Sequence, residues 1–485
     1  MLKRFICLLL IFTLAVSLSG CKIIEKVINN SDASAYLDNE SKTVSNFSSQ
    51  NSSSSDVSQS KPNVSSKSNI SSSSKTNSVS ISVTTSGSHQ TVKSDNKIAQ
   101  PKVEKLSDVN SFGSVHKKVA SKDYYQYQFL SENGKILYNR IFNAVKNSQS
   151  IITVSDLGCN EEESSLVFNV FFADNPQYFY ISKTYLQVFD SEGIEIRAII
   201  LLYTDGRVTD DYNNNLQLTT TANRDLIDKQ IYALQCFMED VLNKIPADAE
   251  DVLKERIIHD YIAEWVTYDE KIAEADIDYD AAIPVDYTIY GAAVERSAVC
   301  EGYSKLFQYL CYNVGLNCTL IEGDSFDFLH MWNAVLIDGK WYQIDVTWDD
   351  DEAYTSYSYF NLTTDNMERD HKIDLSRLKL PNCISTDKSF LNTFAVYAKY
   401  STLTPTSYKE QVLLSNQLLN KKIHIYINGH VTNPLGDIEV DRYKSFMQSY
   451  IYRENCEFMK YLNANNIKIS LQYRAEGHYV VIDIL

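Results

Sequence analysis

The chain has 485 residues, of which 62 are acidic and 45 are basic, and its formal charge at pH 7 is −17. Because a chain this acidic has no dense Lys/Arg block beyond its first residues, we do not expect it to bind nucleic acid. The composition becomes globular from about Pro101 onward, and the remaining length is enough for two or three domains. The oligomeric state stays open.

Residues 1–20 have the pattern of an export signal. Two basic residues precede an apolar run that is too short for a comfortable membrane span, and small residues follow it. The tetrad Leu18-Ser19-Gly20-Cys21 resembles the lipobox of bacterial lipoproteins. This resemblance implies cleavage before Cys21, lipidation of Cys21 and a lipid anchor on the extracytoplasmic face of a bacterial membrane. The alternative is a plain secretory signal with a chance cysteine.

Residues 21–100 are rich in Ser and Asn and poor in aromatic and large aliphatic residues. Such a sequence cannot bury enough apolar surface to offset the entropy lost on ordering. We therefore predict a flexible stalk that holds the folded part away from the membrane.

The cysteines suggest a free thiol and not a metal site. Of nine cysteines, Cys7 lies in the signal and Cys21 at the lipid site, so an odd number remains in the exported protein. They form neither a CxxC pair nor a cluster with zinc spacing. The acidic run 349–352 lacks the glycine of a tight calcium loop and is interpreted as a solvated turn. We expect no metal and no cofactor.

Residues 101–221 are predicted to form an N-terminal α+β region. Apolar residues recur at helical spacing after Ser131, and a second helix is expected over 160–172. Residues 175–190 and 195–204 have the composition of strands. This region shows no catalytic constellation.

The middle region, 222–384, opens with two predicted helices. The first covers 224–245 and ends at Pro246, which cannot continue a helix. The second lies within 248–270 and contains His259. A lone helical histidine is usually a packing or surface residue, and we assign it that role.

A third helix is predicted to begin at Cys300. One face of this helix is apolar, and a glycine ends it: Tyr303, Leu306, Phe307, Leu310, Val314 and then Gly315. Unpaired N–H groups and the helix dipole make a helix start favourable for a thiolate. A cysteine there, taken alone, is more often a small buried apolar residue.

A hairpin supplies possible partners for the thiol. Asp338-Gly339 between two β-rich runs predicts a two-residue type I′ turn, which sets Trp332 opposite Asp345. His330 then points to the same face and lies diagonally from Asp345, within about 7–8 Å. A carboxylate on one imidazole nitrogen leaves the other nitrogen free to take a proton from a thiol. The alternative is a structural His–Asp bond beneath a sheet.

Three separated blocks carry a resemblance: YGAAVERSAVCEGYSKLFQYLC, the strand of His330, and WYQIDVTWDD. They resemble the transglutaminase-like domain of the papain-like cysteine enzyme superfamily, especially its kyphoscoliosis-peptidase-like branch. The run YFNLTTDNMERDH, which ends at His371, fits the same branch. The resemblance covers about residues 250–372 and implies that Cys300 is the nucleophile, His330 the base and acid, and Asp345 the group that orients the base.

The resemblance also implies the fold. We expect an α+β papain-like core, in which a helix carrying the cysteine packs on an antiparallel sheet carrying the histidine and the aspartate. Two smaller α+β regions flank this core, and the second comprises residues 385–485. There we expect a strand at 422–429, a helix at 439–465 and a closing hairpin.

Oxyanion stabilisation is predicted to come from backbone N–H groups at Cys300, since a helix start points donors outward. Three aromatic residues near the motifs, Tyr287, Tyr290 and Trp348, are interpreted as core residues, because Tyr and Trp usually fill space.

The sequence thus predicts a surface-tethered, thiol-dependent acyl-transfer enzyme that forms a thioester. It would act on a protein or a cell-wall peptide, as a transglutaminase or as a cysteine peptidase. The alternative is a non-catalytic cell-surface binding or scaffold protein that retains the fold. That alternative predicts ordinary reactivity at Cys300, or a disulfide with Cys311 or Cys318.

Overall fold

A computed structural model describes the folded part of the chain. The described residues are 105–190, 195–204, 222–275, 283–326, 328–351 and 354–394, together with strands at 79–85 and 88–94 and short pieces between 396 and 484. The signal and Cys21 lie outside the described residues. Within the described part, no helix combines the length and the apolar character needed to cross a membrane. The fold class is α+β, as predicted.

The N-terminal region contains a five-stranded antiparallel sheet in the order β2-β1-β4-β5-β3. The strands are β1 (Val79–Thr85), β2 (Ser88–Ser94), β3 (Ile151–Thr153), β4 (Ile181–Phe189) and β5 (Ile196–Tyr203). The last two confirm the predicted strands. The β1–β2 hairpin differs from the predicted 21–100 stalk, because β1 pairs with β4. Aliphatic residues alternate with Ser and Thr along β1, a strand pattern that the overall Ser-rich composition hides.

Two helices pack against each other in this region, α4 (Glu132–Lys146) and α5 (Glu161–Asp174). Each begins at a side-chain cap, as Ser131 Oγ accepts from Gly134 N and Asn160 Oδ1 accepts from Glu163 N, both at 2.8 Å. Both predicted helices are therefore confirmed. Two short 3₁₀ segments precede them, η1 (Ser121–Asp123) and η2 (Gln126–Phe129).

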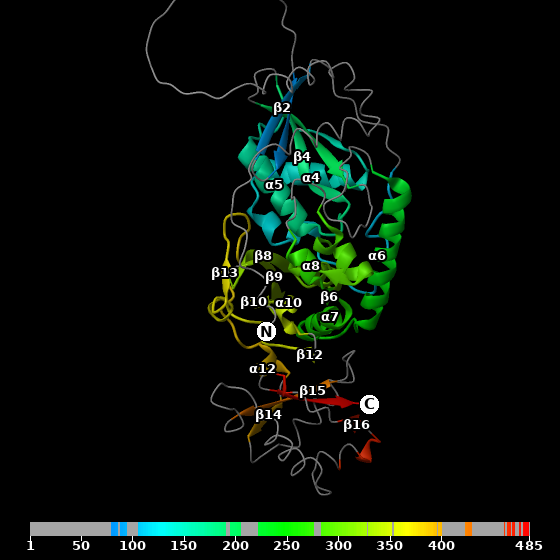
Figure 1. Ribbon diagram of the computed structural model, residues 1–485, viewed down its shortest axis with the longest axis vertical. Helices are drawn as coiled ribbons and strands as arrows, with labels where there is room; N and C mark the ends of the chain where they lie inside the picture. The colour runs from blue at the N-terminus through cyan, green and yellow to red at the C-terminus, as the bar shows by residue number, and fades with distance from the viewer. Residues whose placement is uncertain are drawn as a thin grey trace, which may run out of the picture.

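Three long helices belong to the middle region: α6 (Arg224–Lys244), α7 (Asp251–Trp265) and α9 (Cys300–Val314). All three were predicted, and α6 runs along one flank of the molecule (Figure 1). Every residue of α9 after Cys300 is buried, so this helix passes through the core. It ends at Gly315, whose φ of 92° is the left-handed conformation typical of a helix C-terminus.

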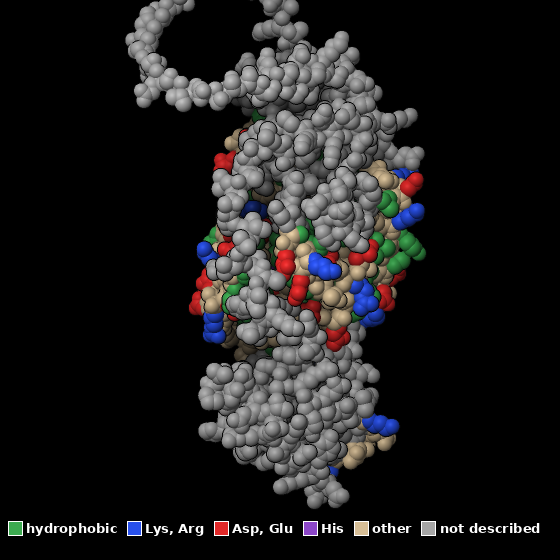
Figure 2. Space-filling view, in the orientation of Figure 1, with side chains coloured by type: hydrophobic (Ala, Val, Ile, Leu, Met, Phe, Trp, Pro, Cys, Tyr) green, Lys and Arg blue, Asp and Glu red, His purple; other side chains and the backbone are tan. Residues whose placement is uncertain are grey.

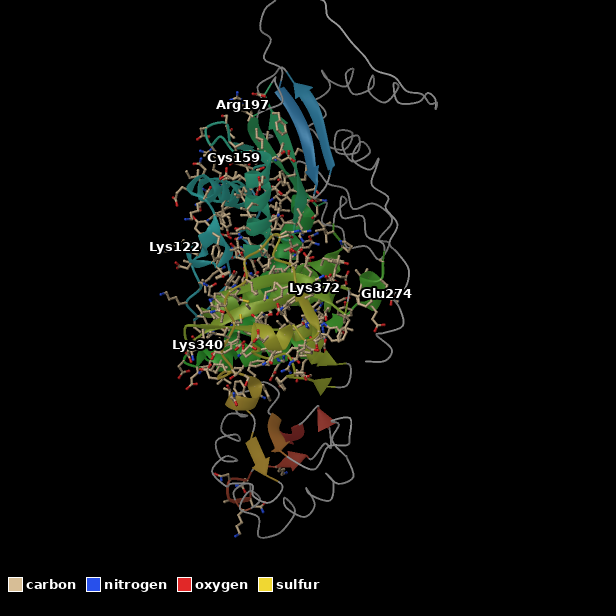
Figure 3. The ribbon with its side chains drawn as sticks, turned by 90° about the vertical axis from the view of Figure 1, so that its left-hand side faces the viewer. Lys122, Cys159, Arg197, Glu274, Lys340 and Lys372 are labelled. Carbon is tan, nitrogen blue, oxygen red and sulfur yellow. The ribbon has the colours of Figure 1, made fainter. Side chains whose placement is uncertain are left out.

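The middle sheet is antiparallel, in the order β10-β9-β8-β13, and α9 packs on β8 and β9. Its strands are β8 (Cys318–Ser325), β9 (Phe328–Ile337), β10 (Lys340–Ile344) and β13 (His371–Ile373). Figure 3 marks Lys340 on β10 and Lys372 on the outer strand β13.

The predicted hairpin register is confirmed to the end of β10. Asp338 and Gly339 have φ values of 50° and 79°, as a type I′ turn requires, and Leu336 pairs with Trp341. The last pair is Asn333 with Ile344. The next residue, Asp345, leaves the strand and caps the short helix α10 (Val346–Asp349).

One apolar core joins the N-terminal and middle regions. The largest buried cluster extends from Leu106 to Phe394 and includes residues of α4, α5, α6, α7 and α9. Tyr124 stacks on Tyr312 of α9, with ring centroids 4.1 Å apart, and Val119 N donates to Tyr312 O at 2.9 Å. The predicted domain boundary at 221/222 therefore separates two regions that share one hydrophobic core.

Short elements connect the main ones. They are β6 (Thr267–Tyr268), β7 (Ser297–Ala298), α8 (Glu270–Ala273), η3 (Val285–Tyr287), η4 (Gly291–Glu295), β11 (Asp350–Asp351), β12 (Tyr354–Thr355), α11 (Thr364–Met367) and α12 (Phe390–Thr393). Acidic and basic side chains are interspersed on the face of this part that Figure 2 shows.

The C-terminal region contains a further sheet in the order β14-β15-β18-β16, with β17 beside β18. Its strands are β14 (Val396–Lys399), β15 (Lys422–Asn428), β16 (Ile469–Ser470), β17 (Ala475–Glu476) and β18 (Tyr479–Ile484). The predicted strand at 422–429 and the closing hairpin are confirmed. The predicted helix at 439–465 lies largely outside the described residues.

Candidate active site

Cys300 is the first residue of α9 and is half-buried. Val299 before it is extended, with φ −96° and ψ 179°, and supplies no side-chain cap. The N–H groups of the first helical turn and the helix dipole favour a negative charge at this position. The structure thus places the thiol where the sequence predicts it, at a helix start that favours a thiolate.

Gly302 allows the preceding loop to approach this helix start, a role that the sequence pattern did not reveal. A Cβ atom at Gly302 would lie 2.5 Å from Asp286 O and 2.7 Å from the Cβ of Ala298. The backbone of η3 is therefore packed against the first turn of α9. A glycine inside a strongly periodic helix is the signal that points to such a close approach.

His330 and Asp345 lie together, as the hairpin register predicts. Nε2 of His330 donates to Oδ2 of Asp345 at 2.6 Å, and the Asp345 side chain is fully buried. The other oxygen, Oδ1, accepts from the backbone N of Trp348 at 3.1 Å and so caps α10. The carboxylate is thus fixed from both sides and fixes the imidazole in turn.

The same contact sets the charge of the pair. Burial by itself lowers the pKa of His330, but the charge and hydrogen bond of Asp345, with a smaller effect of Cys300, raise it to about 10. Burial opposes ionisation of Asp345 too, yet His330 and His371 hold its pKa far below the usual range. The Cys300 thiol is close enough to raise the pKa of His330 further. A protonated ring beside a sulfur stabilises a thiolate, so a proton can pass between Cys300 and His330 while Asp345 stays ionised.

His371 joins the cluster as a fourth member. Its Nε2 lies 3.0 Å from the same oxygen of Asp345 that His330 contacts, and its Nδ1 lies 2.6 Å from Asp370 Oδ1. Its side chain is fully buried. The sequence motif ends at this residue, but the spacing along the chain does not reveal that His371 shares the carboxylate of Asp345.

The possible ligand atoms of His330, Asp345 and His371 lie within 4.8 Å of one another, a spacing that can hold a metal ion. The hydrogen bonds to Asp345 account for the same spacing without an ion. The absence of a metal at these residues therefore stays a prediction.

A second buried histidine lies behind the first cluster. His259 on α7 contacts Asp260 Oδ1 through Nδ1 at 3.0 Å and Asp349 Oδ2 through Nε2 at 3.2 Å. Burial alone lowers the pKa of His259, but the two carboxylates raise it to about 9. The interpretation of 349–352 as a solvated turn is wrong for Asp349, whose side chain is fully buried because it pairs with His259.

The aromatic residues near the site divide into two groups. Tyr287 and Tyr290 are buried, which confirms the core assignment. Trp348 is only half-buried, and its ring centroid lies 6.1 Å from that of His330 and 5.4 Å from that of Phe326. The core interpretation of Trp348 is therefore wrong, since this half-exposed ring lies beside His330 and Phe326.

Cys300 is a free thiol in the structure. Cys311 and Cys318, the two partners that a locked thiol would need, are also free, and both are buried. A disulfide between Cys300 and either residue is therefore not part of this structure.

Comparisons with known proteins match the middle region. Residues 240–346 match the Transglutaminase-like superfamily. Kyphoscoliosis peptidase from Mus musculus is 30% identical over 135 residues, and its Homo sapiens counterpart is 29% identical over the same length. These alignments cover 25% and 24% of this chain, which spans about a fifth of each relative, 19% and 20%.

A solved structure described as a TGase aligns at 20% identity, covering 29% of this chain and 35% of that chain, with a TM-score of 0.22. The family match includes both Cys300 and Asp345 and stops before His371. The α+β core has the expected arrangement, with the cysteine helix packed on the antiparallel sheet of the histidine. The chain therefore contains a transglutaminase-like domain.

Proposed function

We propose that this chain is a thiol-dependent acyl-transfer enzyme in which Cys300, His330 and Asp345 form a catalytic triad. One observation carries the proposal: the His330 ring contacts the Asp345 carboxylate through Nε2 at 2.6 Å, and the Cys300 thiol is close enough to raise the pKa of that ring. This arrangement holds the ring in the tautomer and direction that proton transfer needs.

The reaction has two stages. The Cys300 sulfur attacks the acyl carbon of an amide, and the amine leaves with the proton held by His330. The resulting thioester is then attacked by an acceptor, whose proton passes to His330 as the C–S bond breaks and the Cys300 thiolate is released. Backbone N–H groups at the start of α9 are the donors we assign to the oxyanion.

The acceptor decides the name of the activity. Water as acceptor gives peptidase activity, which the name of the two relatives favours, and an amine gives transamidation, which the superfamily name favours. We propose a protein or cell-wall peptide as substrate. We also propose that a lipid on Cys21 holds the enzyme at the extracytoplasmic face of a bacterial membrane, which the Leu18–Cys21 tetrad supports.

The test is the pH dependence of alkylation at Cys300. The chain with Cys21→Ser is treated with iodoacetamide at a series of pH values, and Cys300 modification is followed by peptide mass. A His-paired thiolate reacts at pH values well below about 8.5, the free-thiol pKa, and His330→Ala shifts the curve upward.

An alkylation curve that is the same with and without His330 would show an ordinary thiol. In that case the chain is better described as a binding or scaffold protein that retains the fold. A His330-dependent curve justifies a substrate search with both water and amine acceptors.

A further inference from the structure

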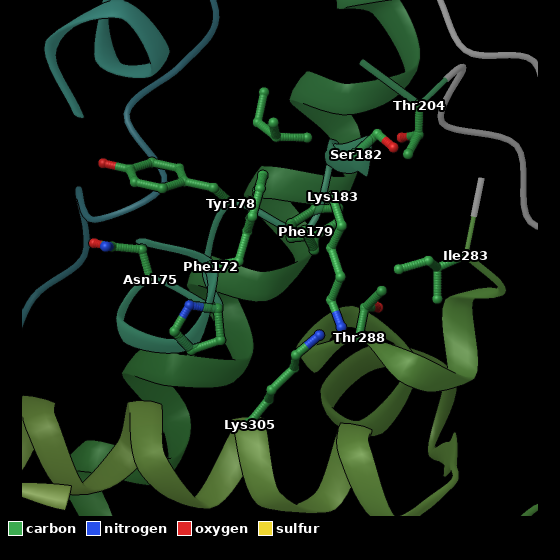
Figure 4. A pocket seen from close by; sticks show the side chains of 12 residues that line it. Phe172, Asn175, Tyr178, Phe179, Ser182, Lys183, Thr204, Ile283, Thr288 and Lys305 are labelled. Carbon is green, nitrogen blue, oxygen red and sulfur yellow. The ribbon is translucent and has the colours of Figure 1, made fainter. Parts of the chain in front are cut away.

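A small pocket lies between the N-terminal region and α9 (Figure 4). Residues from the end of α5, the following turn, β4 and α9 line it. Three aromatic side chains form part of the wall: Phe172, Tyr178 and Phe179. Two lysine side chains, Lys183 and Lys305, point toward each other across it. We call this site the two-lysine pocket.

The two ammonium groups share a single carboxylate oxygen. Nζ of Lys183 lies 2.7 Å from Glu301 Oε1, and Nζ of Lys305 lies 2.6 Å from the same atom. Burial opposes ionisation of Glu301, but the two lysine charges hold its pKa at about 2. Burial lowers the pKa of Lys305, and the Glu301 charge only partly offsets this. While both lysines are protonated, one carboxylate balances only one ammonium, so this group of three side chains has a net positive charge.

A second carboxylate nearby does not remove this excess. Glu322 acts electrostatically on both Lys183 and Lys305, but it also lies 3.6 Å from Arg377. Asp374 acts on both Glu322 and Arg377, so the wider group holds three acidic and three basic side chains. The positive charge is therefore confined to the pocket wall, where two ammonium groups face one carboxylate, whereas the chain as a whole has a formal charge of −17.

The lysines also keep unused hydrogen-bond donors. An ammonium group carries three N–H bonds. Among the described residues, Lys305 Nζ donates to Glu301 and to Tyr287 O, the latter at 3.0 Å, whereas Lys183 Nζ donates to Glu301 alone. Donors from both lysines are therefore available to a ligand with two acceptor oxygens.

Two chain neighbours link the pocket to the surroundings of the thiol. Glu301, which both lysines contact, directly follows Cys300 in α9, and Phe172 of the pocket wall directly precedes Ala173. Ala173 belongs to the apolar cluster against which Cys300 packs. A peptide in extended conformation advances about 3.4 Å per residue, so a short peptide bound at Cys300 can extend toward the pocket.

We propose that the two-lysine pocket binds a carboxylate of the peptide substrate whose acyl group Cys300 transfers, an inference that rests on the proposed function. The two carboxylate oxygens accept hydrogen bonds from Lys183 and Lys305, and the aromatic walls contact the adjoining carbon atoms. The substrate is then an anionic peptide, with an acidic side chain or a free C-terminal carboxylate close to the reacting bond.

The simpler role for these residues is structural, an ion cluster that holds β4 against α9. A structural bridge to Glu301 needs one lysine, and a second ammonium at the same oxygen adds like-charge repulsion. The excess charge at a pocket wall is what favours ligand binding over a purely structural role. The experiment below separates the two.

Three thiol reagents of equal length provide the test. Each is an iodoacetyl-glycyl peptide: one ends in glutamine amide and is neutral, one ends in glutamate amide, and one ends in glutamine with a free carboxylate. The chain carries Cys21→Ser and Cys236→Ser, so that neither thiol consumes reagent. Second-order rates at Cys300 are followed by peptide mass.

We expect the better anionic reagent to react about fivefold faster than the neutral one. This is the size of effect expected for a single ion pair with the partly exposed Lys183 side chain. Which anionic reagent is faster identifies the source of the carboxylate. Raising the salt concentration to about 0.5 M should reduce the preference, because it screens the charges.

Two substitutions should move this preference in opposite directions. Lys183→Gln removes one ammonium and should lower the anionic-to-neutral ratio to about one. Glu301→Gln removes the competing carboxylate and should raise the ratio. The matched control is Lys372→Gln on β13, which changes the net charge equally but does not line the pocket, and it should leave the ratio unchanged.

Equal rates for all three reagents, or a preference that survives Lys183→Gln, would overturn the carboxylate site and leave a structural ion cluster. The proposed function stands in that case if the neutral reagent still reacts in a His330-dependent manner. If Cys300 reacts with the neutral reagent as slowly in the parent chain as in His330→Ala, both proposals fail together.

Discussion

Asp345 and Asp349 lie at opposite ends of one short helix, and each of the two carboxylates contacts a buried histidine. Asp345 contacts His330 and His371, and Asp349 contacts His259. The backbone N of Asp349 also donates to Asp345 O at 3.2 Å. The helix α10 thus connects the contact between His330 and Asp345 to His259 on α7. A substitution at Asp345 or at Asp349 should therefore also shift the carboxylate at the other end of the helix.

His371 should act as a positioning residue, since it contacts Asp345 and not the thiol. His371→Ala leaves Asp345 with one donor fewer in a buried site, which costs about 1–3 kcal/mol. We expect Cys300 alkylation at neutral pH to slow by about tenfold, because a 1.4 kcal/mol change is a factor of ten. The measurement is the iodoacetamide rate at Cys300.

The variant His371→Gln is the matched control, because its amide can still donate to Asp345. It should recover most of the rate. Equal loss in both variants, with a lower unfolding midpoint in both, would indicate that the buried ring is needed for the fold and not for orientation.

The His259 cluster should make stability depend on pH. Folded His259 keeps its proton up to about pH 9, whereas in the unfolded chain it loses it near about pH 6.5. Between pH 6.5 and pH 9 the folded state binds more protons than the unfolded state. The contribution of His259 to the free energy of unfolding is therefore complete below pH 6.5 and is lost as the pH rises to 9.

Urea unfolding of the parent chain and of His259→Gln, at pH 6 and pH 9, measures this contribution. We expect the variant to be less stable by about 3 kcal/mol at pH 6, as for a broken buried ion pair. The difference should shrink by pH 9. A difference that stays constant over this range would show that His259 contributes by packing alone.

Gly302→Ala should disturb the helix α9, which carries Cys300. The added Cβ meets two groups that cannot move aside easily, the backbone oxygen of Asp286 and the Cβ of Ala298. We expect a loss of about 1–3 kcal/mol in the free energy of unfolding, as for overpacked cores, and slower alkylation of Cys300.

Gly113→Ala is the control. Its Cβ would lie 2.8 Å from Glu239 Oε1, the end of a flexible side chain that can turn away. Thermal unfolding should therefore separate the two substitutions. If Gly302→Ala is tolerated as well as Gly113→Ala, the packing of η3 against α9 is looser than the structure indicates.

The reactivity of the thiols should follow their surroundings. Burial raises the pKa of Cys159 to about 11 and that of Cys383 to about 12, and it raises the pKa of Cys311 further. In the folded chain we expect iodoacetamide to modify Cys300 and the exposed Cys236 ahead of these three. Peptide mass after brief labelling, with and without urea, checks this order.

Cys236 serves as an internal reference, because it lies on α6 and its side chain is exposed. Only the rate at Cys300 should change in His330→Ala. A parallel change at both cysteines would point to general loosening of the fold.

The sequence predicts the triad because each of its members depends on a local rule. The Asp338-Gly339 turn fixes the hairpin register as far as the pair Asn333–Ile344, and Asp345, the next residue, contacts His330 although it has left the strand. Cys300 follows from the apolar periodicity of one helix. In these cases a few neighbouring residues determine the geometry, so that inference from the sequence is reliable.

The surrounding network depends on contacts that local patterns do not encode. His259 and Asp349 are 90 residues apart in the chain, and Lys183 and Glu301 are 118 residues apart. Nothing in the sequence near His259 indicates its partner, so the sequence predicts only a packing or surface role for this histidine. The β1–β2 hairpin differs from the predicted stalk for another reason. The Ser-rich composition of residues 21–100, averaged over the whole segment, hides the short alternating pattern of β1.

The contact between Lys183 and Glu301 has a consequence for how this protein can be divided. Lys183 on β4 and His371 on β13 both lie outside residues 240–346, the segment that matches the superfamily. An excised fragment with the matched boundaries would keep the thiol but lose both of these supports. Changes in the N-terminal region can therefore alter the surroundings of Cys300 while the cysteine helix stays the same, so the structural unit around the thiol is larger than the segment that matches the superfamily.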